Sequence, residues 1–520
     1  MKRIFYGLIV GALVLQISPS YGQDRVRDLV VKIHTTRRGP DLVKPWTKLS
    51  PANISRTGVV TEGNVILTNA HVVQYASQIY VQPNQSSDRI PAHVVGIAPA
   101  IDLALLRLEE SQFFKDRGFL AFADDLPGVK ESVNVYGYPT GGSELSVTEG
   151  IVSRIEFANY YYFATGLRIQ VDAALNPGNS GGPAVSKGRL VGLVFSQIRN
   201  AQNIGYLIPV EEIRMFLADI ADGRYDGKPQ FYDLFQTVEN DALRSRLHVP
   251  RGVGGLMVVQ PFVNSPSYPL KEWDVITNIG DQAIDSEGKV AVRYDLRLSA
   301  GYLIQKMAKG ATVELTVLRD GQSLKIKLPL NDQREFVVPY LMNQEPRYFI
   351  YGPLVFSQAT QDYLERLGSQ WEVALARQGN PLALRRYDKP AFPGEEMVVV
   401  ASPMFSHRIT KGYDDPNTSV VSEVNGVAIK NLSHLVEVLR DLKDPHVVFK
   451  FAKTANQPRE TLVFNRAEIM STTEEILNDN GIRFPYSEDI RPIWEGAKSA
   501  KADKAAVEPK EGTKSQALMH

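Results

Sequence analysis

One serine stands among glycines and prolines in the stretch from Asn176 to Pro183, which reads Asn-Pro-Gly-Asn-Ser-Gly-Gly-Pro. Glycine loosens the backbone and proline removes an amide donor, so this stretch fits neither a helix interior nor a central strand. We expect a fixed loop that holds Ser180 outward, with a turn at Gly178 that lets the amides of Gly178 and Ser180 point at one spot. A serine hydroxyl beside two converging N–H groups suits acyl transfer, with a nucleophile and an oxyanion hole. Taken alone, the stretch fits a glycine-rich turn with a solvated serine equally well.

A histidine and an aspartate each stand beside a strand-like run. His71 ends the stretch Thr68-Asn69-Ala70-His71, directly after the apolar run Val65 to Thr68. We therefore expect it at a strand end and not on a helix face. Asp102 opens the strand-like run Leu103 to Leu108. Imidazole is the usual general base, and a carboxylate can orient it. Each residue also has a structural alternative, as a side chain that caps a strand or a turn.

Composition excludes several classes of site. The chain has 520 residues, 43% hydrophobic and 22% charged, which is ordinary for a globular protein of two to four domains. Its formal net charge is zero, so neither nucleic acid nor an anionic membrane is expected as its main partner. There is no cysteine, and the eight histidines lack the spacing of a metal-ligand pair on one helix. We expect no metal and no cofactor.

The N-terminus has the pattern of an export signal. Lys2 and Arg3 precede an apolar run from Ile4 to Val14, and small residues follow near Gly22. This pattern predicts a secretory signal peptide over residues 1–22, and the run is too short for a stable membrane span. An uncleaved N-terminal anchor is the alternative. The mature protein is expected outside the cytoplasm, in the periplasm if the source is a Gram-negative bacterium.

Many short strand-like runs separated by turn signals predict an all-β barrel or sandwich pair up to the helix-like segment Val210 to Ile220. Two further β-rich modules follow, and they share a layout that suggests diverged repeats. Asp320-Gly321, between two alternating runs, predicts a hairpin in the first of them. From Ala497 the chain is rich in Lys, Ala and Glu, which is typical of a disordered tail.

Three stretches together resemble the catalytic motifs of the HtrA/Deg serine proteases. They are Thr68 to His71, Asp102 to Leu106, and the loop Asn176 to Pro183 around Ser180. They occur in the order His, Asp, Ser of the chymotrypsin fold. The resemblance covers about residues 28–466 and implies a mainly β fold, with a chymotrypsin-like double β-barrel followed by two PDZ-like α/β modules. One departure is the run Ser55-Arg56-Thr57-Gly58, where the family often has Gly-Ser-Gly.

The resemblance divides the chain into a signal peptide and four further parts. They are a trypsin-like protease domain at 23–222, a first PDZ domain at 228–335, a second, degenerate PDZ-like domain at 346–470 and a C-terminal extension at 471–520. In the first PDZ domain, the stretches Gly255 to Val259 and Leu270 to Ile279 carry the likeness. Its peptide loop would be Gly254-Gly255-Leu256-Met257, which lacks the fuller alternation of glycine and apolar residues. The last module is similar to the degenerate second PDZ of plant-type Deg proteases.

Roles for the residues follow from the same resemblance. Ser180 would attack the scissile carbonyl, His71 would act as base and then acid, and Asp102 would orient His71. Amides of Gly178 and Ser180, with help from Asn179, would form the oxyanion hole. The primary pocket would be walled by Gly192, Leu193, Val194, Phe195 and Ser196 and the loop up to Asn203, which contains no acid, so an apolar P1 residue is expected.

The expected function is a serine endopeptidase that degrades unfolded or damaged proteins in extracytoplasmic quality control. Its substrates would be unfolded chains or peptides, because these offer an extended backbone that can pair with a strand edge. The family resemblance further implies C-terminal peptides at the first PDZ domain and a homo-oligomer, either a trimer or a multiple of trimers. Two alternatives stay open: a non-proteolytic chaperone or holdase, and a scaffold whose protease is latent until a PDZ domain binds a peptide.

Overall fold

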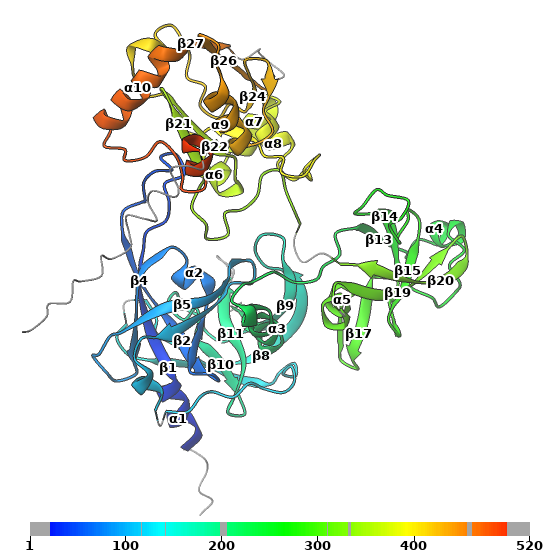
Figure 1. Cartoon of the computed structure of the whole chain (residues 1–520). Helices are drawn as coiled ribbons and strands as arrows, with labels where there is room; N and C mark the ends of the chain where they lie inside the picture. The colour runs from blue at the N-terminus through cyan, green and yellow to red at the C-terminus, as the bar shows by residue number, and fades with distance from the viewer. Residues whose placement is uncertain are drawn as a thin grey trace, which may run out of the picture.

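The computed structural model describes residues 21–115, 117–140, 142–197, 205–308, 310–330, 334–454 and 460–496. These residues form a pair of β-barrels, a middle module and a C-terminal module (Figure 1). The predicted signal peptide lies outside them, apart from Tyr21 and Gly22, which begin helix α1 (Tyr21–Leu29). The predicted disordered tail from Ala497 also lies outside the described residues. Within the described ranges, no helix is long and apolar enough to cross a membrane.

The first barrel closes through six antiparallel strands in the order β1-β2-β3-β6-β5-β4. Alternating apolar residues point inward and form its core, with Ile33, Ile66 and Leu106 fully buried. A tight turn at residues 62–64 joins β2 to β3, with Thr61 paired to Val65. The strands are β1 (Val30–Arg37), β2 (Ala52–Thr61), β3 (Val65–Thr68), β4 (Ala76–Pro83), β5 (Ile90–Ala98) and β6 (Leu103–Leu108), with α2 (Ala70–Val73), η1 (Pro99–Ile101) and η2 (Ser111–Phe114) between or after them.

The second barrel repeats this closure in the order β10-β11-β12-β9-β8-β7. Its strands are β7 (Ser132–Gly137), β8 (Ser146–Asn159), β9 (Thr165–Val171), β10 (Pro183–Ser186), β11 (Arg189–Gln197) and β12 (Gly205–Pro209). Helix α3 (Val210–Asp219) follows, as the periodicity predicts, and η3 (Ile220–Asp222) ends this part. The two closed barrels confirm the predicted mainly β, chymotrypsin-like architecture of the protease domain.

The middle module is a sheet in the order β13-β14-β15-β19-β20, with β16 on β15 and a separate β17-β18 ribbon. The Asp320-Gly321 hairpin is present, and both residues have positive φ, as a tight two-residue turn requires. Its elements are β13 (Leu234–Thr237), α4 (Asp241–Arg246), β14 (Leu256–Gln260), β15 (Val275–Ile279), β16 (Gln282–Ala283), β17 (Lys289–Arg293), β18 (Leu296–Ser299), α5 (Gly301–Met307), β19 (Thr312–Arg319) and β20 (Gln322–Pro329).

The C-terminal module has a three-stranded sheet, β21-β22-β23, and a four-stranded sheet, β25-β24-β26-β27. The strands are β21 (Tyr348–Tyr351), β22 (Leu354–Gln358), β23 (Val398–Val400), β24 (Val421–Val424), β25 (Val427–Ala428), β26 (His446–Phe451) and β27 (Leu462–Asn465). The helices are α6 (Gln361–Glu365), α7 (Trp371–Arg377), α8 (Pro381–Leu384), η4 (Arg408–Thr410), α9 (Leu432–Asp441), α10 (Arg466–Asp479) and α11 (Arg491–Glu495).

The expected boundary of this module at residue 470 falls inside α10. The chain beyond it still belongs to the module, because Phe349 of β21 forms a β-bridge with Tyr486. Tyr486 and Ile490 also share a buried core cluster with Phe349. The folded part of the C-terminal module therefore includes residues well past 470.

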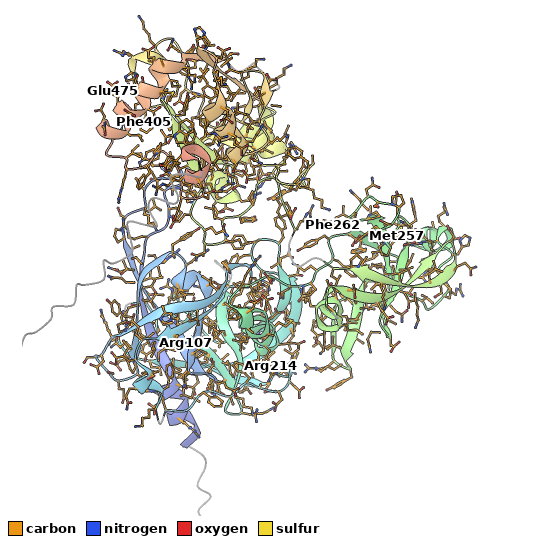
Figure 2. All side chains as sticks on the ribbon, viewed as in Figure 1. Arg107, Arg214, Met257, Phe262, Phe405 and Glu475 are labelled. Carbon is orange, nitrogen blue, oxygen red and sulfur yellow. The ribbon has the colours of Figure 1, made fainter. Side chains whose placement is uncertain are left out.

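The long loop between β1 and β2, residues 38–51, joins the first barrel to the C-terminal module (Figure 1). Trp46 in this loop packs its ring 5.7 Å from that of Phe405, which Figure 2 labels in the C-terminal module. Lys48 forms an ion pair of 2.7 Å with Glu345. The middle module instead contacts the second barrel, where Nε2 of Gln305 donates to the carbonyl oxygen of Thr165 at 2.9 Å. Arg293 also donates to the carbonyl oxygens of Leu126 and Pro127, in the connection between the barrels.

Candidate active site

The three predicted catalytic residues come from different connections of the two barrels. His71 lies in α2, a single helical turn that follows β3 directly, so the expectation that it avoids a helix was wrong. One turn is too short to leave a periodic signal in the sequence. Asp102 ends η1 and precedes β6, as predicted. Ser180 lies in the connection between β9 and β10 of the second barrel.

The imidazole of His71 is held by the carboxylate of Asp102. Nδ1 of His71 lies 2.7 Å from Oδ2 of Asp102, and the backbone N–H of His71 donates to Oδ1 at 2.8 Å. The Asp102 side chain is 2% exposed, whereas that of His71 is 35% exposed. A buried carboxylate that engages both the ring and the backbone fixes the ring orientation and leaves Nε2 toward the open side.

Asp102 adopts a left-handed backbone conformation, with φ of +56°. Aspartate tolerates this region better than most residues, but it still needs support from its surroundings. Asn69 supplies that support, because its Nδ2 donates to the carbonyl oxygen of Asp102 at 3.0 Å from a fully buried position. The sequence reasoning assigned no role to Asn69, although it stands two residues before His71 in the quoted motif.

The loop that carries Ser180 begins with a tight turn. The N–H of Asn179 donates to the carbonyl oxygen of Asn176 at 3.0 Å, and Gly178 has φ of +109°. A proline followed by a residue of positive φ, closed by such a bond, is the pattern of a type II turn. A Cβ at Gly178 would lie 2.4 Å from the carbonyl oxygen of Tyr138, so only glycine fits here.

Two threonines that sequence reasoning missed hold this turn against the first barrel. The buried hydroxyl of Thr57 donates to the carbonyl oxygen of Gly178 at 2.9 Å and accepts the N–H of Tyr138 at 2.9 Å. The N–H of Thr57 donates to the carbonyl oxygen of Ser180 at 3.2 Å. Thr68 donates its hydroxyl to the carbonyl oxygen of Thr57 at 2.8 Å. The serine loop is therefore clamped between the barrels by buried hydrogen bonds.

Some backbone N–H groups of the serine loop are hydrogen-bonded within the protein, and others are free. In the described part of the chain, no protein acceptor binds the N–H of Gly178 or of Ser180. The N–H of Asn179 is used within the turn, and this residue is 1% exposed, so its amide is not available to an incoming oxyanion. Among the described hydrogen bonds, none joins Nε2 of His71 to the hydroxyl of Ser180.

The predicted pocket wall lies on β11, beside the serine loop. Gly192, Leu193, Val194 and Phe195 are in this strand; Ser196 is also in it, but its side chain and residues 198–204 lie outside the described part. Two backbone hydrogen bonds join Val194 to the loop. The N–H of Gly181 donates to the carbonyl oxygen of Val194, and the N–H of Val194 donates to the carbonyl oxygen of Gly182.

An aromatic loop between β8 and β9, residues 160–164, completes the surroundings of Phe195. The ring of Tyr160 lies 5.0 Å and that of Tyr161 5.6 Å from the ring of Phe195. Burial, with a smaller effect of the nearby Asp102 carboxylate, raises the pKa of Tyr161 to about 12. These phenols are therefore neutral near pH 7, and the two rings add no charge to the wall at Phe195.

The expected peptide loop of the first PDZ domain is not at an edge of its sheet. Leu256 and Met257 pair with Thr237 and Gln236 on one side and with Ile276 and Val275 on the other. Because both sides are occupied, a peptide cannot add there as an extra strand, and the expectation for Gly254, Gly255, Leu256 and Met257 was wrong. The edge strand of the sheet on this side is β13.

Metal-binding groups are not gathered at this site or elsewhere in the described ranges. No group of three or more His, Asp or Glu side chains there could hold a metal ion. The residues present offer a hydroxyl, an imidazole, a carboxylate and free amides, which together suit nucleophilic acyl transfer.

Comparison with known proteins agrees with this reading. A trypsin-like peptidase domain model matches residues 56–193, and a PDZ domain model matches residues 337–489. Protease Do-like 2, chloroplastic, of Arabidopsis thaliana is 34% identical over 466 residues, which are 89% of this chain and 75% of that protein. Protease Do-like 4, mitochondrial, of the same plant is 32% identical over 79% of this chain and 76% of its own length.

Among solved structures, the HtrA-type protease AlgW with tripeptide covers 61% of this chain and 98% of its own, at 23% identity and a TM-score of 0.47. The Arabidopsis relatives match most of both chains, so the likeness extends beyond the barrels to the C-terminal module. The chain is a serine endopeptidase and belongs to the HtrA/Deg family of serine proteases, with plant-type similarity.

Proposed function

We propose that this serine protease cleaves unfolded or damaged protein chains outside the cytoplasm through His71, Asp102 and Ser180. The observation that carries the proposal is the 2.7 Å contact between Nδ1 of His71 and the buried Asp102 carboxylate, beside a serine loop clamped by hydrogen bonds. The predicted N-terminal signal supports the location, and the periplasm is the expected compartment in a Gram-negative bacterium.

In the proposed reaction, Nε2 of His71 takes the proton of the Ser180 hydroxyl as the oxygen attacks the scissile carbonyl. Asp102 keeps the ring oriented and stabilises the imidazolium that forms. The free N–H groups of Gly178 and Ser180 receive the negative charge that develops on the carbonyl oxygen. His71 then returns the proton to the leaving amine. In the second half, Nε2 of His71 takes a proton from the water that attacks the acyl carbonyl, and it gives this proton to the Ser180 oxygen as the ester bond breaks.

The rings of Tyr160 and Tyr161 beside Phe195 favour an uncharged, apolar residue at P1. The sheet edge at β13 is the place in the middle module where a C-terminal peptide would add as a strand. The proposed protein consists of a protease domain, two PDZ-like modules and a tail, and it forms a homo-oligomer, either a trimer or a multiple of trimers.

The test compares the mature chain from Gln23 with its Ser180→Ala variant on an unfolded protein such as reduced casein. Ser471→Ala is a matched control, because Ser471 is exposed on α10 of the C-terminal module. We expect cleavage by the wild type and the control and none by Ser180→Ala. If none of the three cleaves casein, yet all suppress aggregation of a heated client, the holdase alternative replaces the proposal.

A specific contact favours regulated cleavage as a second candidate function. The segment that leads into the C-terminal module packs on the aromatic loop, with the ring of Phe336 5.2 Å from that of Phe163. It also reaches the connection just after α2, where Asn343 Oδ1 accepts the N–H of Tyr75 at 2.8 Å. Addition of peptides with free C-termini tests this: a rise in casein cleavage supports a latent protease, and an unchanged rate supports a constitutive one.

A further inference from the structure

A hollow of about 670 Å³ lies beside the serine loop, on the side away from β11. It is bounded by β1, by β2, by the connection after β7 and by Pro177 of the turn. None of its lining residues carries a carboxylate. They are Lys32, Asn53, Ile54, Ser55, Arg56, Pro139, Thr140, Gly142, Ser143 and Pro177.

Hydrogen bonds connect the walls of this hollow to the reacting serine. The N–H of Thr140 donates to the carbonyl oxygen of Pro177, next to Gly178, at 2.6 Å. On the β2 wall, Arg56 precedes Thr57, whose N–H binds the carbonyl oxygen of Ser180. The hollow is therefore fixed relative to Ser180.

The hollow lies on the side of Ser180 where the substrate residues that follow the scissile bond would bind. The serine loop lies between two strands: β11 binds it through Gly181 and Gly182, and β2 binds it through Ser180. If the residues before the scissile bond run along β11, as the proposed P1 wall requires, an extended chain continues past Ser180 onto the β2 side. The residues that follow the scissile bond then lie over the hollow.

Two cations without a carboxylate partner face this path. Nζ of Lys32 donates to the carbonyl oxygen of Gly142 at 2.9 Å, and Nη1 of Arg56 donates to the carbonyl oxygen of Ser55 at 2.8 Å. Neither forms an ion pair with any acid of the described chain. Since an ammonium has three donors and a guanidinium five, both retain donors for a ligand.

The surroundings leave the charge of Arg56 without compensation from an acid. Burial, and to a lesser degree the charge of Arg37, lower the pKa of Arg56, which means that its cation lacks the compensation usually found for a half-buried arginine. The acid closest in sequence to the hollow is Glu144, whose Oε1 accepts the hydroxyl of Ser143 at 3.4 Å.

We propose that this hollow is a subsite for a carboxylate on the leaving side of the substrate, within the first three residues after the scissile bond, with Arg56 and Lys32 as its specificity-determining residues. The proposal rests on the proposed function. The carboxylate can come from an Asp or Glu side chain within a longer chain, or from a free C-terminus two or three residues past the cleaved bond.

The experiment uses quenched fluorescent peptides with one apolar P1 residue and Glu, Gln or Lys at each of the first three positions after the scissile bond. At one of these positions, wild-type kcat/KM is expected to be about fivefold higher for Glu than for Gln and lower for Lys, as a partly screened ion pair allows. A second pair of short peptides ends at the same position, one with a free carboxylate and one with an amide. A higher kcat/KM for the free acid indicates recognition of a terminal carboxylate, and the Glu peptides report on a side-chain carboxylate.

Variants assign the effect to the two cations. Arg56→Gln and Lys32→Gln are each expected to reduce the Glu-to-Gln ratio toward 1, and Arg56→Glu to reverse the order of Glu and Lys. The ratio compares two peptides on one preparation, so a partly folded variant does not distort it. Arg107→Gln is the matched control, because Arg107, labelled in Figure 2, is an exposed arginine on β6 of the same barrel. It does not line the hollow.

The outcomes separate the two proposals. Cleavage that depends on Ser180 but shows equal kcat/KM for Glu, Gln and Lys at all three positions, and for acid and amide, overturns the subsite and leaves the protease function intact. A Glu preference that survives both Gln variants also overturns it. If the wild type cleaves no peptide and no casein, the proposed function fails and the subsite with it.

Discussion

The ring of Tyr162 in the aromatic loop lies 4.5 Å from the ring of Tyr340, in the segment that leads into the C-terminal module. Tyr162 belongs to the same short loop as Tyr160 and Tyr161, which pack on Phe195. Two residues 178 positions apart in the sequence therefore join the last module of the chain to the wall beside the proposed nucleophile. We expect the C-terminal module to act on cleavage through this contact.

The first prediction concerns this contact. We expect Tyr162→Ala and Tyr340→Ala each to lower kcat/KM on an unfolded substrate by about threefold to tenfold, the range that loss of one aromatic pair allows. The double variant should be little worse than either single one, because both remove the same contact. Tyr294→Ala is the control, since this side chain is fully exposed on the middle module. Fully additive losses would show that the two rings act independently.

The second prediction concerns Asp102. Asn at this position keeps the shape, but its amide cannot accept both the backbone N–H and the ring N–H of His71 as the carboxylate does. We expect kcat to fall by about 10⁴ with KM changed little, because the imidazole is left in the wrong tautomer. The exposed Asp125→Asn is the control. A loss smaller than about tenfold would remove Asp102 from the proposed triad.

The third prediction concerns Thr57, which is buried and bonds the turn at Gly178. Val at this position has the same shape but leaves the Gly178 carbonyl and the Tyr138 N–H without partners, at a cost of about 1–3 kcal/mol. We expect kcat to fall by about tenfold to a hundredfold, and Thr57→Ser to restore most of it. Measurement of the melting temperature beside kcat and KM separates the two effects: a loss in stability alone, with kcat per folded molecule unchanged, would contradict the prediction.

The fourth prediction concerns pH and Asp362 in α6. Burial raises the pKa of this carboxyl above its ordinary value of 3.8, although its Oδ2 accepts the N–H of Leu341 at 2.8 Å. Because the folded state binds the proton of this carboxyl more tightly than the unfolded state does, the stabilising contribution is fully present below pH 3.8. It is lost as pH rises through the folded pKa. Asp362→Asn should therefore raise the denaturant midpoint of the C-terminal module at pH 7.5 and change it less at pH 4.

The exposed Asp320→Asn, in the β19-β20 turn, serves as the control for that pH comparison. Fluorescence of Trp494, which packs against the core of the C-terminal module, reports on unfolding of that module. An equal shift at both pH values would mean that Asp362 acts through shape and not through ionisation.

The sequence was sufficient for features whose signal is local. The loop around Ser180, the strand after Asp102 and the Asp320-Gly321 turn each carry glycine, proline or an alternating run that restricts the backbone. The one-turn helix at His71 gave no such signal. The contact between Thr57 and Gly178 joins residues 121 positions apart and exists only because one barrel packs on the other.

The error at Gly254 to Met257 has a related cause. The stretch Gly255 to Val259, which carried the likeness to a PDZ domain, does lead into and form a strand, β14. Which strand lies at the edge of a sheet depends on pairing between distant segments, and β13, at only four residues, left a weak pattern. Local sequence therefore predicted the element but not its place in the sheet.

The loop between β1 and β2 has a consequence for the order in which the chain is made. Leu42 packs with the buried core around Leu375 and Leu382, and Trp46 packs beside Tyr348, so early residues complete a module built much later. Lys48 and its partner Glu345 are 297 residues apart. During synthesis from the N-terminus, the barrels can fold before the C-terminal module exists to cover the apolar side chains of this loop. The chain is therefore most prone to aggregation in the interval before that module emerges.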